Sequence, residues 1–229
     1  MTDKRFAGFS PELSAFLREL AQNNNKGWFD ENRKRYERLM LEPAKAFVVA
    51  MKPALDTIAP GLHAEPRVGG SIMRVARDTR FAKDKTPYKT HLDMMFWEGM
   101  GRNKDAPCFF MRIGARQLSV GAGLHGFSAD QLEHYRKAVA DDRTGATLRD
   151  AIRAVSNRGF EVNEPHYMRV PRGFEADHPN ASLLRHSSLY ASRSDPVPDA
   201  LFSPGAVDYC RQLFVALRPI QSWLVEVLR

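Results

Sequence analysis

The apolar residues change their spacing along the chain, and this change limits the possible folds more than any other feature of the sequence. Near the N-terminus they follow the three-to-four-residue period of a helix with one buried face, as in Leu13, Leu17 and Leu20. Between residues 70 and 125 apolar and polar residues alternate over short stretches, which is typical of β-strands. Helical spacing returns after Gly126.

We therefore predict one α+β domain spanning residues 1–229. An N-terminal helical layer covers residues 10–60, a sheet covers residues 70–125, and helices and loops fill residues 126–229. Short connections between successive strands predict a mainly antiparallel sheet of about four to six strands, flanked by the N-terminal and C-terminal helices. The predicted strands are 71–78, 91–98, 109–113 and 117–120, with a short strand at 167–170 and an edge strand at 189–193.

The composition indicates a cytoplasmic protein with an affinity for anions. The net charge is +7, which favours anionic partners through long-range attraction. Cys108 and Cys210 lie far apart among apolar neighbours, so we expect two reduced core residues, as in a reducing compartment. The first five residues lead into no apolar segment, and no apolar run approaches the length of a membrane span, so neither a secretory signal nor membrane insertion is expected.

The most unusual segment runs from residue 74 to residue 89 and carries six cations and two carboxylates beside apolar residues. Arginine guanidinium groups suit bidentate contact with phosphate or carboxylate groups, and lysines supply further charge. One hypothesis is therefore a pocket of an enzyme that acts on a phosphorylated or acidic small molecule. The predicted anion-binding residues are Arg74, Arg77, Arg80, Lys85 and Lys89. The predicted proton-handling residues are Asp78, Asp84, Tyr88 and His91.

Two other interpretations of this segment stay open. The segment could be a purely structural network, since arginine–aspartate pairs satisfy the backbone of a long loop well, and Arg77, Asp78 and Asp84 favour this interpretation. The protein could also be a non-catalytic module that binds nucleic acid or an acidic protein partner through cations spread over its helices. Neither a cofactor nor an oligomeric state follows from the sequence.

Other motifs carry weaker signals. His91 and Asp93 lie two residues apart, a spacing that allows acid–base chemistry but is common on half-exposed strands. No histidine has the spacing of a metal site. The glycines at 121, 123 and 126 have the spacing of a dinucleotide-binding loop, but the predicted antiparallel hairpin before them argues against that fold.

Three segments together resemble a known family. They are Asn23-Asn24-Asn25-Lys26 with Trp28-Phe29, the segment from Arg74 to Lys89, and Pro171-Arg172-Gly173-Phe174 followed by Asp177-His178-Pro179. Over nearly the whole chain the sequence resembles the bacterial family called domain of unknown function 2461. The resemblance implies a single cytoplasmic domain whose signature is the cluster of charged residues, and it implies no reaction. Met73 stands where the family pattern leads us to expect phenylalanine.

Overall fold

The computed structural model describes residues 6–99 and 105–229, and the chain divides into two compact units. The first unit holds the residues up to 96, together with 110–119 and 194–212. The second unit holds residues 97–109, 120–193 and 213–229. The segment 1–5, considered above for a secretory signal, lies outside the described residues. The single-domain organisation remains a prediction.

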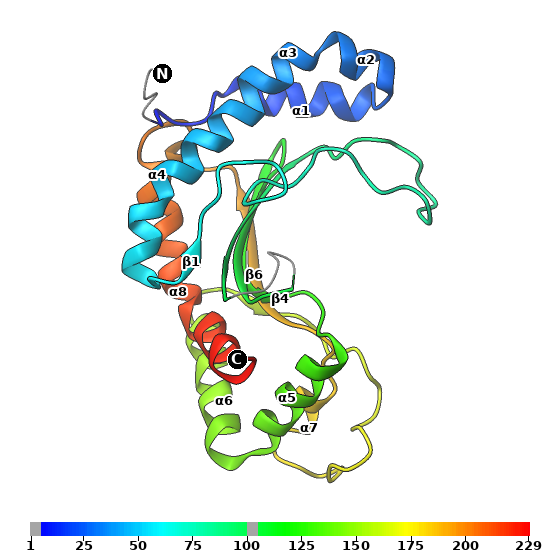
Figure 1. Ribbon diagram of the computed structural model, residues 1–229, viewed down its shortest axis with the longest axis vertical. Coiled ribbons are helices and arrows are strands. Elements are labelled where there is room, and N and C mark those ends of the chain that lie inside the picture. The colour runs from blue at the N-terminus through cyan, green and yellow to red at the C-terminus, as the bar shows by residue number, and fades with distance from the viewer. Residues whose placement is uncertain (1–5, 100–104) are drawn as a thin grey trace. The chain divides into compact units, whose positions relative to one another are not determined.

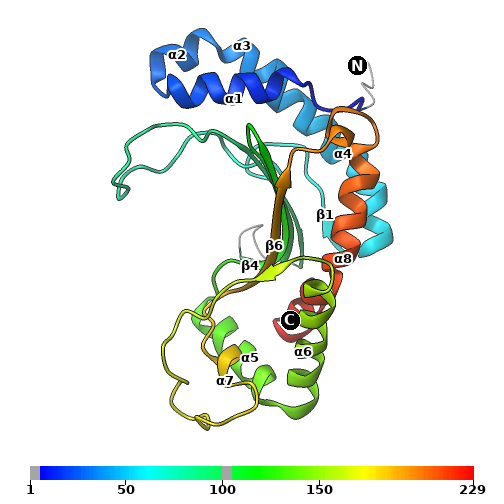
Figure 2. The same cartoon turned by 180° about the vertical axis from the view of Figure 1, so that it is seen from behind.

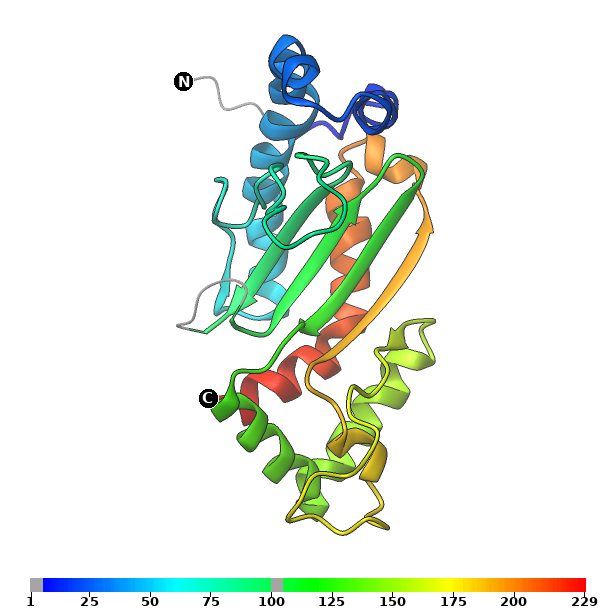
Figure 3. The same ribbon diagram turned by 90° about the vertical axis from the view of Figure 1, so that its right-hand side faces the viewer.

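A six-stranded antiparallel sheet confirms the α+β class (Figure 3). Its order is β1 (Leu62–His63), β2 (Leu92–Glu98), β3 (Cys108–Ile113), β4 (Gln117–Leu124), β6 (Leu189–Pro196) and β5 (Glu161–Val162). The strand predicted at 189–193 exists but is not an edge strand, because β5 pairs with its outer side. The strand predicted at 167–170 is wrong, since that segment is irregular and the short strand lies at β5 instead.

The first unit begins with helices whose buried positions match the predicted period (Figure 1). Leu13, Leu17 and Leu20 are all buried. The Asn25 side chain caps α2 by accepting the Trp28 backbone N–H at 3.0 Å. The elements are α1 (Glu12–Gln22), α2 (Lys26–Glu31), α3 (Arg33–Tyr36), the π-helical turn η1 (Glu37–Leu41), α4 (Glu42–Ile58), the 3-10 turn η2 (Asp199–Phe202) and the start of α8 (Ala206–Val227).

The second unit contains α5 (Ala129–Ala140), α6 (Asp142–Ser156), α7 (Ala181–Leu184), β5 and most of α8 (Figure 2). The predicted capping box opens α5, with Ser128 and Gln131 each bonding the backbone of the other. Cys108 and Cys210 are free and buried, one in each unit, and burial raises the pKa of each thiol to about 12. In the part of the chain that the structure describes, every helix is too short or too polar to cross a bilayer.

Residues 71–90 form a long two-stranded extension, which we call the arm (Figure 1). The regular strand predicted at 71–78 is therefore wrong. Two isolated bridges, Ile72 with Met94 and Ala76 with Tyr88, stand in place of a continuous ladder. The outgoing segment pairs first with β2 and then with its own returning segment, so local alternation in the sequence was a poor guide to the pairing.

The change of partner produces a bulge at the base of the arm. Met73 donates its backbone N–H to the Asp93 carbonyl at 3.0 Å, whereas Lys89 donates to the Val75 carbonyl at 2.8 Å. One residue between Met73 and Val75 therefore faces three residues between Lys89 and Asp93. The two additional residues bend the returning segment, and His91 lies within the bend. Bulges of this kind re-aim side chains and are common beside functional sites.

The loop between α1 and α2 holds the arm through Tyr88. The Asn24 amide donates to the Tyr88 carbonyl at 2.8 Å and accepts the Tyr88 backbone N–H at 3.0 Å. The Phe29 and Tyr88 rings stack with centroids 4.0 Å apart. The asparagine-rich motif and the charged motif are therefore in direct contact, even though 64 residues separate Asn24 from Tyr88 in the sequence.

Gly123 owes its place to close packing between strands. Its φ is +139°, and a Cβ added there would lie 2.2 Å from the Leu189 carbonyl oxygen. A side chain at this position would therefore push β4 away from β6. The close approach of β4 and β6 therefore explains why residue 123 is a glycine, and no nucleotide-binding role is needed to explain it.

We predict that Gly123→Ala lowers the free energy of unfolding by about 2–3 kcal/mol, through overpacking and backbone strain. Gly126→Ala is the matched control, because nothing lies within 4 Å of the Cβ it would add. Urea denaturation of both variants measures the difference. Equal stabilities would contradict this explanation of Gly123.

We predict that Asn24→Ala loosens the arm without unfolding the protein. The Tyr88 amide should exchange its hydrogen about tenfold faster or more, since the side chain that bonds it is lost. Asn23→Ala is the control, because the Asn23 side chain bonds only the nearby Glu19 carbonyl within the described residues. Hydrogen exchange followed by NMR makes the comparison, and identical exchange of Tyr88 in the two variants would refute the clamp.

Candidate functional site

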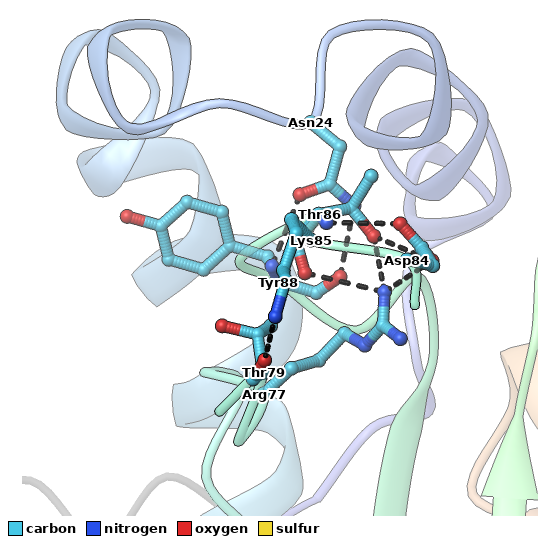
Figure 4. Close-up of polar contacts among 7 residues, drawn as sticks. All are labelled: Asn24, Arg77, Thr79, Asp84, Lys85, Thr86 and Tyr88. Atoms are coloured by element: carbon cyan, nitrogen blue, oxygen red, sulfur yellow. Dashed lines mark hydrogen bonds and ion pairs between the residues drawn. The ribbon is translucent and has the colours of Figure 1, made fainter. Parts of the chain in front are cut away.

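Arg77 is bound within the arm by the arm's own returning segment (Figure 4). Its guanidinium contacts the Asp84 carboxylate, the Thr86 hydroxyl and, at 3.2 Å, the Thr86 carbonyl. The Thr86 backbone N–H, the Arg77 guanidinium and the Thr86 hydroxyl together lower the pKa of Asp84 to about 2. These contacts favour the structural interpretation for Arg77 and Asp84.

The tip of the arm is paired in the same way. Arg80 forms a two-pronged contact with Asp78, with its Nε 3.0 Å and its Nη2 2.7 Å from the carboxylate oxygens. The Arg80 side chain and backbone lower the pKa of Asp78. Lys85 donates to the Thr79 carbonyl at 2.9 Å. Because these groups are exposed, their contacts contribute little to stability. The Arg80 guanidinium and the Lys85 ammonium group nevertheless already have partners within the arm.

Asp93 gathers two cationic side chains and an imidazole at the base of the arm. Lys89 Nζ lies 2.9 Å and His91 Nε2 lies 3.2 Å from Asp93 Oδ2, while Arg112 Nε lies 2.6 Å from Oδ1. Leu92 and Met94 are buried on one face of β2, so Asp93 projects from the opposite face. Lys89 immediately precedes the bulge, His91 lies within it, and the neighbouring strand β3 supplies Arg112.

The Asp93 cluster carries more positive than negative charge. The Asp93 side chain is only 13% exposed, whereas that of Arg112 is 54% exposed. Burial alone would raise the pKa of Asp93, but hydrogen bonds from His91, Arg112 and Lys89 outweigh it and hold the pKa well below its usual range. One ionised carboxylate thus faces two permanent cations and an imidazole.

A groove of about 620 Å³ opens between this cluster, the arm and α1, and we call it the arm groove. Most of the predicted site residues line this groove. Arg112 lines it as well, although the sequence analysis did not predict a role for this residue. The lining residues are Ala21, Asn24, Arg77, Asp78, Asp84, Thr86, Tyr88, Lys89, Thr90, His91 and Arg112. The only available signal for Arg112 was a lone charge among the apolar residues of β3.

Three predicted anion-binding residues lie outside the lining of the arm groove: Arg74, Arg80 and Lys85. Arg74 is exposed, and its guanidinium has no hydrogen bond or ion pair to any residue that the structure describes. In Figure 4 the Tyr88 hydroxyl points away from Arg77 and Asp84, while its backbone faces Asn24. The roles predicted for these residues stay predictions.

Within residues 6–99 and 105–229, no group of three or more histidine, cysteine, aspartate or glutamate side chains comes together with the arrangement of a metal site.

Comparison with known proteins places the chain in a family. No curated protein matches the sequence. The model of the family described as "Conserved hypothetical protein (DUF2461)" matches residues 12–223, which is nearly the whole chain and includes α1, the arm and the Asp93 cluster. The resemblance on the asparagine-rich and charged motifs is thereby confirmed, and the chain belongs to the DUF2461 family.

Proposed function

We propose that the arm groove binds a small acidic molecule and that the protein is an enzyme acting on it, with His91 as the group that transfers a proton. A single observation carries this proposal: Lys89, His91 and Arg112 all converge on the one carboxylate of Asp93, and all three line the groove. An anionic ligand would balance the positive charge of Lys89 and Arg112 that the single Asp93 carboxylate does not neutralise.

The geometry around Asp93 favours a ligand contact by Arg112. Only its Nε donates to Asp93, so the rest of the planar guanidinium is left to present its donors to a carboxylate or phosphate group. Lys89 is 26% exposed and adds charge from the arm side. Preorganised cations of this kind stabilise negative charge that develops during a reaction.

His91 has the surroundings of a general acid–base residue. Its Nε2 lies beside Asp93, so a neutral ring bonded through Nε2–H leaves Nδ1 to accept a proton. Asp93 is itself fixed by Arg112 and Lys89, which orients the imidazole through a carboxylate that stays ionised. Tyr88, Asp78 and Asp84 are proposed as parts of the groove wall that shape the site from the arm.

Arg74, Arg80 and Lys85 lie outside the lining of the arm groove, so this proposal gives them no direct contact with the ligand. Arg74 is exposed and is proposed to attract the ligand through charge alone. Arg80 and Lys85 are proposed to hold the arm tip in shape through their own contacts. A cytoplasmic location is part of the same proposal.

Binding of nucleic acid or of an acidic protein partner is the weaker alternative. Several helical cations that could follow a phosphate backbone are already paired with the protein's own carboxylates. These pairs are Arg33 with Asp30, Arg35 with Glu19, Arg38 with Glu12, Lys137 with Glu133 and Arg153 with Asp150. A surface of mixed pairs is a poor track for several successive phosphates.

We predict that Arg112→Gln and Lys89→Gln each weaken the binding of malonate or inorganic phosphate about tenfold, which corresponds to the loss of one charge-assisted contact. Arg211→Gln is the matched control: Arg211 also donates its Nε to an aspartate, Asp208, but lies outside the arm groove. Isothermal titration calorimetry at low salt measures the affinities. Binding that is absent in the wild type, or equally weak in all three variants, would contradict the proposal.

We predict that His91→Gln also weakens the binding of malonate or inorganic phosphate, because the His91 imidazole lines the arm groove beside Lys89 and Arg112. His134→Gln is the control, since His134 lies on α5, outside the lining of the arm groove. Isothermal titration calorimetry at low salt measures both affinities. Equal binding by the two variants would remove His91 from the site.

A further inference from the structure

A second pocket, of about 320 Å³, lies in the first unit between α1 and the turn that joins β3 to β4. We call it the arginine pocket, because α1 contributes Arg18, β3 contributes Arg112 and the turn contributes Arg116. The lining of the pocket also offers polar groups, from Thr90, Gln117 and Ser119.

The arginine pocket differs from the arm groove in its charge. Three guanidinium groups and His91 line it, and no carboxylate of the described residues does. The arm groove, in contrast, holds Asp78 and Asp84. The pocket therefore has a net positive charge that the described part of the protein leaves largely unbalanced.

The guanidinium groups of two of the three arginines have no hydrogen bond or ion pair within the part of the chain that the structure describes. Arg18 and Arg116 are both exposed. The acidic residue next to Arg18 is Glu19, and its carboxylate is taken by Arg35, at 2.7 and 3.1 Å. Only Arg112 has a partner, Asp93, which it contacts through Nε.

His91 and Arg112 line both the arginine pocket and the arm groove, so the two cavities meet at the Asp93 cluster. A ligand whose charged end occupied the arginine pocket would bring its adjoining atoms to His91. Arg112 lines both cavities, so it would contact the same ligand molecule from the arm groove and from the arginine pocket.

We propose that the arginine pocket binds the dianionic phosphoryl group of a phosphate monoester, which makes the ligand of the arm groove a phosphorylated small molecule. The inference rests on the proposed function of the arm groove and names its substrate class. A phosphate monoester presents three acceptor oxygens and close to two negative charges near pH 7, which suits three planar guanidinium groups. A single carboxylate would leave more of their donors and charge unmet.

The test compares binding of methyl phosphate and dimethyl phosphate by calorimetry at low salt. Methyl phosphate is a dianionic monoester, whereas dimethyl phosphate is a monoanionic diester like those of a nucleic-acid backbone. The proteins are the wild type, the double variant Arg18→Gln/Arg116→Gln, which changes the pocket alone, and Lys89→Gln, which changes the groove alone. Arg211→Gln serves as the control, and thermal melting checks that each variant is folded.

We expect the wild type to bind methyl phosphate at least about tenfold more tightly than dimethyl phosphate, and the double variant to lose about tenfold or more of that affinity. Equal affinity of the wild type for the two esters would overturn the monoester assignment. A double variant that binds as the wild type does, while Lys89→Gln binds more weakly, would overturn the arginine pocket and leave the proposed function standing. Binding that is lost in neither variant would overturn both.

Discussion

The structure of the candidate site depends on one partly buried carboxylate, that of Asp93. An ionised carboxylate in such a position is costly unless it is bonded and paired. Asp93 meets this requirement with partners from two segments: Lys89 and His91 from the base of the arm, and Arg112 from β3. The carboxylate therefore fixes how the bulge meets the sheet, and it brings two cations and an imidazole to the meeting point of two cavities.

The arm is held at its base and closed along its length by contacts of different kinds. Asn24 and Phe29 hold Tyr88 through backbone hydrogen bonds and ring stacking. Further out, Arg77 and Arg80 are satisfied by aspartates of the arm itself. The charged motif thus does two things. Its outer part stabilises its own shape and forms one wall of the arm groove, whereas Lys89, its last residue, joins His91 and Arg112 around Asp93.

The sequence predicted the helices and the central strands well, because their apolar period depends on local spacing alone, as Leu13 and Leu17 illustrate. It failed for the arm, since alternation over a few residues does not reveal a change of strand partner at a bulge. The pairing of Arg77 with Asp84 was foreseeable from their closeness in the sequence, whereas Arg80, predicted to bind an anion, pairs with Asp78. The roles of Arg18, Arg112 and Arg116 were not foreseeable, because only tertiary packing of α1 against the sheet brings these distant residues together.

Anion binding beside Asp93, and not at the arm tip, is tested most directly by a residue-by-residue map of NMR chemical-shift changes in the wild-type protein as inorganic phosphate is added. We expect saturable changes at the backbone of His91 and at the side-chain Nε–Hε signals of Arg112 and Arg18, with Arg80 unaffected. Changes confined to Arg80 and its neighbours at the arm tip, with none around Asp93, would contradict the account.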